Sequence, residues 1–153
     1  MAKLKGNPVI GLIFRIVLAG VLLYAGGVKL IEPHGARDAI MAYRIFPPAW
    51  APVMGYALPL LEIALGLFLL VGLFVRLSAI VTAILMLAFV AGIISVWVRG
   101  YSIDCGCFGG GGDISPAGRA TRYTQEIVRD LAFTGMGLWL FVWPRSLYSL
   151  EKN

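Results

Sequence analysis

Two cysteines, Cys105 and Cys107, are the residues of this chain best suited to chemistry, and they are its only thiols. They lie one glycine apart in the stretch RGYSIDCGCFGGGGDIS, residues 99–115. Cysteines at this spacing can reach the Cα separation of about 4.4 to 6.8 Å that a disulfide requires, but the ring they close is small and strained. A strained, exposed disulfide is a stronger oxidant than a structural one. The pair therefore favours reversible thiol–disulfide exchange, with Cys105 and Cys107 in the catalytic role.

Two other interpretations of the cysteine pair stay open. A closed zinc site takes about four ligands, and the chain adds one histidine, His34, and its carboxylates, so a metal site would need ligands from a partner. A permanent disulfide could instead staple the loop, although so short a loop gains little entropy from closure. We favour redox exchange over the staple and the staple over the metal, and we assign no metal ligands.

The charges around the loop act on the thiols in opposite directions. Asp104 precedes Cys105 and disfavours a thiolate, whereas Arg99, Arg119 or Arg122 folded over the loop would favour one. The sequence leaves this balance open.

The composition predicts a membrane protein. The chain of 153 residues is 59% hydrophobic and 14% charged, against about 25% charged in an average soluble domain. A helix needs about 20 apolar residues to cross the bilayer core. Three apolar runs reach this length: residues 9–31, 52–73 and 77–98. A fourth run starts at 127 or 131 and ends at 143. It is long enough only if Arg129 and Asp130 enter the outer part of the membrane.

The four runs favour helices over a closed β-barrel, because they lack the alternation of a barrel strand. We therefore predict an all-α fold: a single integral membrane domain over residues 1–153, built as a four-helix bundle. Its helices are expected at about residues 9–31, 52–73, 77–98 and 127–148.

The basic residues do not indicate nucleic acid. The formal net charge is +5, but lysines and arginines are scattered at the helix ends and form no single face. Their count also fails to choose an orientation in the membrane. Because a redox disulfide belongs on the oxidising side, we place the cysteine loop outside and both termini in the cytoplasm, in a multi-pass protein of the bacterial plasma membrane.

The first loop predicts a short helix at the membrane surface. Residues 32–35, EPHG, end the first span, and Ile40, Tyr43 and Phe46 then recur at helical spacing among charged residues. A helix of this kind lies in the headgroup region, with Tyr43 and Trp50 as interfacial anchors.

Glu62 is a carboxyl group near the middle of the second apolar run. An acid at that depth costs roughly 2.5 to 3.5 kcal/mol on insertion scales. Gly55, Pro59, Glu62 and Gly66 recur at intervals of four, three and four residues, which places them on one stripe of a helix. Because small residues let a second helix approach closely, we expect Glu62 to face the interior of the bundle.

Two basic residues on one face of the first helix, Arg15 and Lys29, are candidate counter-ions for Glu62. Helical side chains lean toward the N-terminus of their own helix. With the predicted orientation, Lys29 leans into the bilayer and Glu62 leans toward it. We therefore expect a contact between Glu62 and Lys29, and we expect Arg15 to extend to the inner headgroups.

The last helix carries a comparable stripe of Glu126, Asp130, Thr134 and Gly137, with Asp130 about one turn below the outer surface. Ionisable groups at membrane depth often line the path of a substrate or proton. On that interpretation Glu62, Lys29, Asp130 and Arg129 bind a protonatable cofactor such as a quinone, menaquinone or ubiquinone. They could equally hold the helices in register.

Several segments together resemble the MauE branch of the DoxX-like membrane proteins. They are GVKL (27–30), YRIFP (43–47), LPLLEIALGLFLLVG (58–72), CGCFGG (105–110) and VRDL (128–131). The resemblance implies a four-helix membrane protein linked to thiol redox chemistry, with a thioredoxin-fold or other extracytoplasmic redox protein as its partner. MauE itself is linked to the maturation of methylamine dehydrogenase, a disulfide-rich enzyme.

The implied mechanism is similar to that of DsbB and the vitamin K epoxide reductase relatives, which oxidise partners and reduce quinone. This chain departs from them because it has two cysteines in place of two pairs. The expected function is a thiol–disulfide component that works through Cys105 and Cys107, similar to a thiol:quinone oxidoreductase. The alternative is a non-catalytic accessory or anchor subunit of a larger respiratory or dehydrogenase complex in the membrane.

Overall fold

The computed structural model describes residues 7–103 and 117–144. The described chain is almost entirely helical, which confirms the all-α class. Four long helices and two short ones follow each other in the order α1 (Pro8–Ile31), α2 (Pro33–Ala42), η2 (Pro48–Trp50, a 3-10 turn), α3 (Ala51–Val71), α4 (Val75–Val98) and α5 (Arg119–Val142).

In the described part of the chain, three helical segments are long and apolar enough to cross a membrane: Pro8–Ile31, Pro48–Val71 and Val75–Val98. The chain is therefore a multi-pass membrane protein. The fourth expected crossing falls on α5, which has 24 residues and a length of about 36 Å at 1.5 Å per residue. Its first half carries Arg122, Glu126, Arg129 and Asp130, so α5 is not among the segments that qualify by composition.

The bounds expected for the last helix, about 127–148, are wrong at the start and at the end. The helix begins at Arg119, directly after Gly118, whose φ of 74° lies in the left-handed region that glycine adopts easily. It ends at Val142 because Trp143 precedes Pro144, and a residue before proline is disfavoured in the helical conformation. Polar residues of the predicted loop thus form the first two turns of α5.

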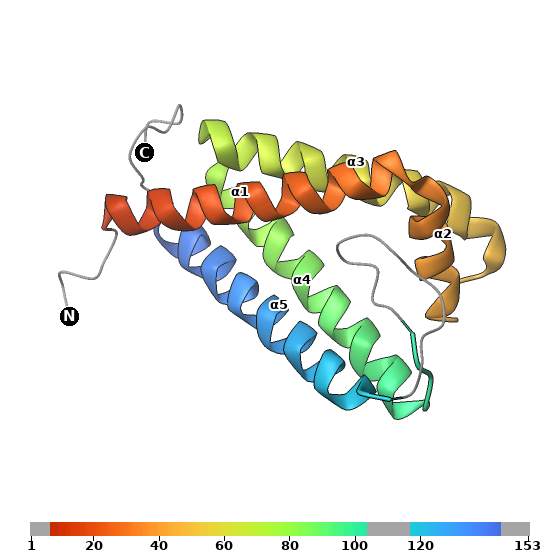
Figure 1. Cartoon of the computed structure of the whole chain (residues 1–153). Helices are drawn as coiled ribbons and strands as arrows, with labels where there is room; N and C mark the ends of the chain where they lie inside the picture. The colour runs from red at the N-terminus through yellow and green to blue at the C-terminus, as the bar shows by residue number, and fades with distance from the viewer. Residues whose placement is uncertain (1–6, 104–116, 145–153) are drawn as a thin grey trace.

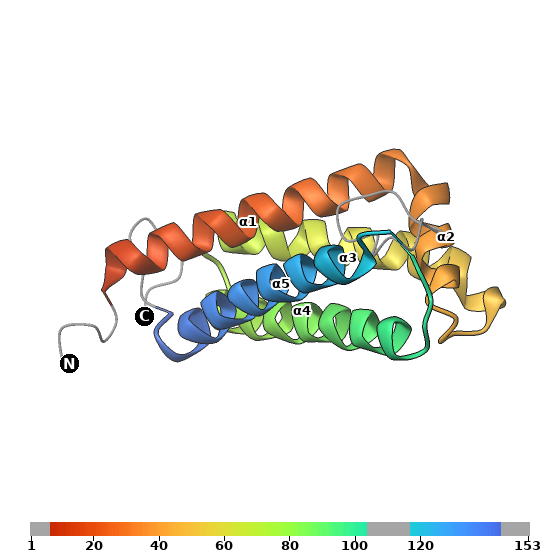
Figure 2. The ribbon, with the colours of Figure 1, turned by 60° about the horizontal axis from the view of Figure 1, so that its bottom comes forward.

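The long helices pack as two pairs, α1 with α3 and α4 with α5. Figure 1 shows the two pairs crossing, with the start of α1 and the end of α5 at the same end of the molecule. Figure 2 shows α2 at the other end, beside the start of α3. That end also holds the last turns of α1 and α4 and the first turns of α5.

Glycines set the distance within each pair. A Cβ atom on Gly26 of α1 would lie 2.8 Å from the carbonyl oxygen of Pro59 in α3. A Cβ on Gly66 of α3 would lie 3.2 Å from the carbonyl oxygen of Ala19. In the other pair, a Cβ on Gly137 would lie 2.9 Å from the carbonyl oxygen of Ala79. Small residues thus bring the backbones into direct contact, as is common between helices in membranes.

Much of the interior is apolar at the end near the start of α1, and the outside of the helices is apolar as well. Leu18, Leu22, Leu69, Val75 and Leu140 form one buried cluster between the pairs. Large apolar side chains of the three spans are exposed in numbers that water would not tolerate, and lipid is their natural surroundings; examples are Ile13, Val53, Leu60, Leu77 and Ile84.

Arg15 does not extend to the headgroups as expected, because its side chain is buried and only 1% exposed. Position 15 falls on the face of α1 that also carries Leu18, Leu22 and Lys29, and that whole face is covered by the other helices.

The short helix of the first loop is present as α2, but it is shorter than the pattern suggests. It ends at Ala42, and Arg44 adopts a positive φ of 53° that turns the chain. Tyr43 packs on Gly92 of α4, where a Cβ atom would lie 3.0 Å from its ring, so this tyrosine faces the protein. Trp50 is exposed and stacks on Phe46, with ring centroids 6.0 Å apart.

Candidate functional site

Lys29 and Glu62 form a buried ion pair between α1 and α3. The Lys29 Nζ atom donates a hydrogen bond of 2.8 Å to Glu62 Oε1, and the side chains are 3% and 0% exposed. Gly26 lies one turn before Lys29, and a Cβ there would be 3.2 Å from the Cβ of Glu62. The glycine therefore lets the two helices approach closely enough for the pair to form. The contact expected from the sequence is confirmed.

The ion pair leaves hydrogen-bonding capacity unused within the described residues. Glu62 Oε2 is buried and has no hydrogen-bond partner there. The Lys29 ammonium carries three N–H donors, of which the bond to Glu62 uses one. The ammonium also lies 5.2 Å from the centre of the Phe89 ring, a favourable distance for a cation over an aromatic face.

Arg129 and Asp130 form a second ion pair on α5. The Nη2 atom of Arg129 lies 2.9 Å from Asp130 Oδ1, and its Nε atom donates a hydrogen bond of 3.0 Å to the same oxygen. Asp130 is 1% exposed. The four charged residues singled out by the sequence thus form two ion pairs, one between α1 and α3 and one within α5.

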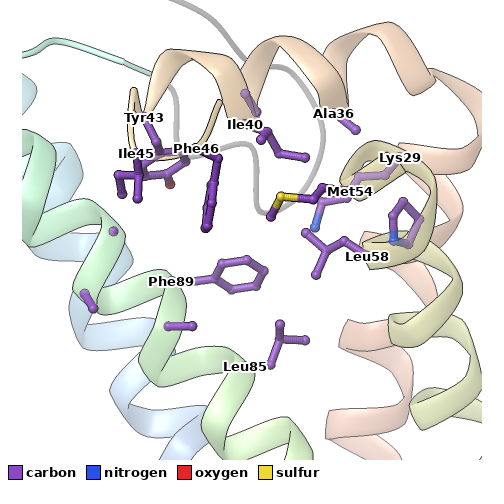
Figure 3. Close-up of a pocket in the computed structure, with 15 residues that line it drawn as sticks. Lys29, Ala36, Ile40, Tyr43, Ile45, Phe46, Met54, Leu58, Leu85 and Phe89 are labelled. Carbon is purple, nitrogen blue, oxygen red and sulfur yellow. The ribbon is translucent and has the colours of Figure 1, made fainter. Parts of the chain in front are cut away.

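A cavity of about 430 Å³ lies beside the Lys29–Glu62 pair, between α2, α3 and α4. Figure 3 shows Phe89 and Leu85 facing Lys29, Met54 and Leu58 across it. Of the described residues that line this space, Lys29 is the one that carries a charge. Glu62, Arg129 and Asp130 do not line it, so the wall formed by the described residues is apolar apart from this one charged group.

One wall of the cavity is the turn after α2, and Arg99 holds this turn against α4. Its guanidinium donates to the carbonyl oxygens of Tyr43 and Arg44, and its Nε atom donates to the Ser95 carbonyl. Sequence reasoning missed both the cavity and this role of Arg99, since neither leaves a local pattern in the chain.

The backbone that enters the cysteine loop is fixed by Tyr123 of α5. The hydroxyl of Tyr123 accepts a hydrogen bond of 2.8 Å from the Ile103 N–H and donates one of 3.0 Å to the Tyr101 carbonyl. Both Tyr123 and Ile103 are buried in a cluster with Ile93 and Val96. Tyr123 lies three residues before Glu126 and so falls on the same stripe of α5 that the sequence predicts. This spacing is the signal by which sequence reasoning could have identified Tyr123.

Cys105 and Cys107 lie outside the described residues, as does Asp104. Of the three arginines expected near the thiols, Arg119 donates hydrogen bonds to the Gly100 carbonyl and the Ser102 hydroxyl, both 3.0 Å long. Arg122 lies 3.7 Å from Glu126 one turn along α5. His34 is exposed on α2.

The sequence matches one family model, described as methylamine utilisation protein MauE, over residues 7–143. No curated protein and no solved structure gives a significant match.

Proposed function

Because the chain belongs to the MauE family, whose model covers most of its length, we propose that this membrane protein is a thiol–disulfide redox component. Cys105 and Cys107 form a disulfide that opens and closes, and a thioredoxin-fold protein outside the cytoplasm is the exchange partner. A quinone of the membrane, menaquinone or ubiquinone, is the other electron carrier.

The anchored backbone next to the cysteines is the observation that carries this proposal. Ile103 is 1% exposed and bound through its N–H to Tyr123, and it lies two residues before Cys105. The chain therefore enters the cysteine motif from a fixed point. That point lies at the end of the bundle that also holds the last turns of α1, with Lys29, and α2. This fixed entry point supports a thiol exchange that takes place at the same end of the bundle.

The proposed reaction has two balanced steps. In the first, a thiolate of the partner attacks the Cys105–Cys107 disulfide, which gives a mixed disulfide and releases one cysteine of this chain as a thiol. A second partner thiol then attacks the partner's sulfur in the mixed disulfide and releases the other cysteine. The partner is oxidised to its disulfide, and both cysteines of this chain become thiols. In the second step the two thiols form their disulfide again and give up two electrons and two protons, which reduce a quinone to its quinol.

The proposal includes a topology. The cysteine loop lies outside, both termini lie in the cytoplasm, and α5 crosses the membrane as the fourth helix. The buried polar face of α5 supports this crossing, because Glu126, Asp130 and Thr134 are covered by the rest of the protein. On the opposite side, apolar residues are exposed from Val128 onward and can face lipid: Val128, Leu131, Leu138 and Phe141.

Thiol trapping in intact cells tests the proposal. A membrane-impermeant reagent should label Cys105 and Cys107 only after reduction, and Cys105→Ser or Cys107→Ser should abolish dithiol-dependent quinone reduction by the purified protein. Ser102→Ala, three residues before the motif, is the matched control and should retain activity. Thiols that are always reduced and shielded from the reagent would overturn the proposal. Cysteine variants that assemble and work normally in a stoichiometric membrane complex would instead establish the accessory subunit.

A further inference from the structure

We propose that the cavity between α2, α3 and α4 binds the head of an uncharged, carbonyl-bearing amphiphile, and that Lys29 donates a hydrogen bond to its carbonyl oxygen. A membrane quinone has this chemistry. The inference that the amphiphile is a quinone, and not another molecule of this class, rests on the proposed function. The binding site itself is argued from the cavity alone.

The size and lining of the cavity suit a ring with the start of an apolar tail. Its volume of about 430 Å³ falls within the range of about 300 to 1,000 Å³ that is typical of small-molecule sites. Phe89, Phe46 and Tyr43 supply aromatic surface on its walls, and Leu58, Leu85 and Met54 supply aliphatic surface. Sites of this kind combine apolar walls with a few placed polar groups, and here that group is Lys29.

The charge balance selects a neutral head over an acidic one. Lys29 is already paired with Glu62 at 2.8 Å, and neither side chain is exposed to solvent by more than 3%. A carboxylate or phosphate added beside this pair would leave one net negative charge buried, which is costly in an apolar site. A carbonyl oxygen accepts a hydrogen bond from the ammonium without adding charge. Within the described residues, two of the three ammonium donors have no protein acceptor.

The cavity opens on a surface that faces lipid. Ala88 and Ala91 of α4 line it, and both are exposed on the outside of a membrane-spanning helix. A lipid-soluble molecule can therefore enter sideways from the bilayer.

Lys29 has a further effect while a carbonyl oxygen is held there. A cation at hydrogen-bonding distance stabilises negative charge that develops on that oxygen as electrons arrive. Glu62 keeps the ammonium in place and, as the second member of the pair, acts as a positioning residue.

The test measures binding of ubiquinone-1, followed by quenching of tryptophan fluorescence, to the full chain in detergent micelles. All variants carry Cys105→Ser and Cys107→Ser, so that binding is measured without thiol chemistry. Ala88→Phe fills the cavity from its open side and should weaken binding at least tenfold. Ala57→Phe, at an exposed alanine of α3 outside the cavity, is the matched control and should not change it.

A second variant, Lys29→Met with Glu62→Gln, removes the charged donor while it keeps the site neutral. It should weaken ubiquinone-1 about tenfold, as expected for a hydrogen bond to a charged donor. Unchanged binding in Ala88→Phe would overturn the cavity as the site, and unchanged binding in the double variant would overturn the role of Lys29. Tighter binding of palmitate than of ubiquinone-1 would establish an acidic lipid as the ligand. If ubiquinone-1 binds as expected but the protein with both cysteines reduces no quinone, the site stands and the proposed function fails.

Discussion

The Lys29 ammonium and the Glu62 carboxylate lie 2.8 Å apart, on two helices whose other buried residues are apolar, apart from Arg15 of α1. This buried contact joins α1 to α3 near the end of the bundle that holds α2. Each charge is tolerated because the other is present.

Removing one member of this pair should therefore cost more than removing both. Lys29→Met or Glu62→Gln alone leaves an uncompensated buried charge and should destabilise the protein by about 3–5 kcal/mol. The double variant, which is neutral and of similar shape, should lose no more than about 2 kcal/mol. Thermal unfolding of the purified protein in detergent measures the four members of this cycle. Additive losses would show that the two groups do not depend on each other.

Gly26 and Gly27 are neighbours that should respond in opposite ways to the same change. A Cβ on Gly26 would lie 2.8 Å from both the Pro59 carbonyl oxygen and the Ile63 Cγ1 atom, whereas one on Gly27 would meet no atom within 4 Å. Gly26→Ala should force α1 and α3 apart and cost about 1–3 kcal/mol. Gly27→Ala should be neutral or stabilise by up to about 1 kcal/mol, because alanine favours helix. Equal unfolding temperatures for the two variants would contradict close packing at Gly26.

Tyr123→Phe should loosen the entry to the cysteine loop without touching a sulfur. The change leaves the buried N–H of Ile103 and the carbonyl of Tyr101 without the hydroxyl that pairs them, at a cost of about 1–3 kcal/mol. We expect faster hydrogen exchange at the Ile103 amide and a changed alkylation rate at Cys105. Tyr56→Phe, at an exposed tyrosine of α3, should alter neither. Identical rates in the two variants would mean that Tyr123 does not position the loop.

Arg99→Gln should release the turn that forms one wall of the cavity. The variant loses the guanidinium that donates to the carbonyls of Tyr43 and Arg44, and glutamine is too short to reach both. Hydrogen exchange in residues 43–46 should rise several-fold, and ubiquinone-1 should bind more weakly. Arg76→Gln is the control, because Arg76 lies in the first turn of α4, at the opposite end of the helix from Arg99, and 5.8 Å from the ring of Phe141. Protection of residues 43–46 that survives in Arg99→Gln would contradict this role.

The residues on the buried polar faces of α3 and α5 could be predicted from their spacing in the sequence. Gly55, Pro59, Glu62 and Gly66 are all buried on α3, and Glu126, Asp130, Thr134 and Gly137 are all on the buried face of α5. A helical period and the cost of a charge in lipid suffice for this result, because they require polar groups to gather on the side away from lipid.

The structure was needed where a residue's surroundings come from distant parts of the chain. Arg15 shares its face with Lys29, but whether it reaches the headgroups depends on which helices cover that face. The first turns of α5 contain polar residues that look like loop in the sequence, and the pairing of Tyr123 with Ile103 keeps them against α4. Local pattern carries no information on either contact.

The sequence by itself determined that the chain lies in a membrane as helices, that Glu62 needs a buried partner, and that its two cysteines are separated by a single glycine. These follow from local rules: the length of an apolar run, the helical period and the solvation of charge. Only the tertiary structure decided that α2, α3 and α4 enclose an apolar cavity and that, among the described residues, Lys29 is the charged group on its wall. A cavity exists only as space between elements far apart in the chain, and its shape depends on how those elements pack.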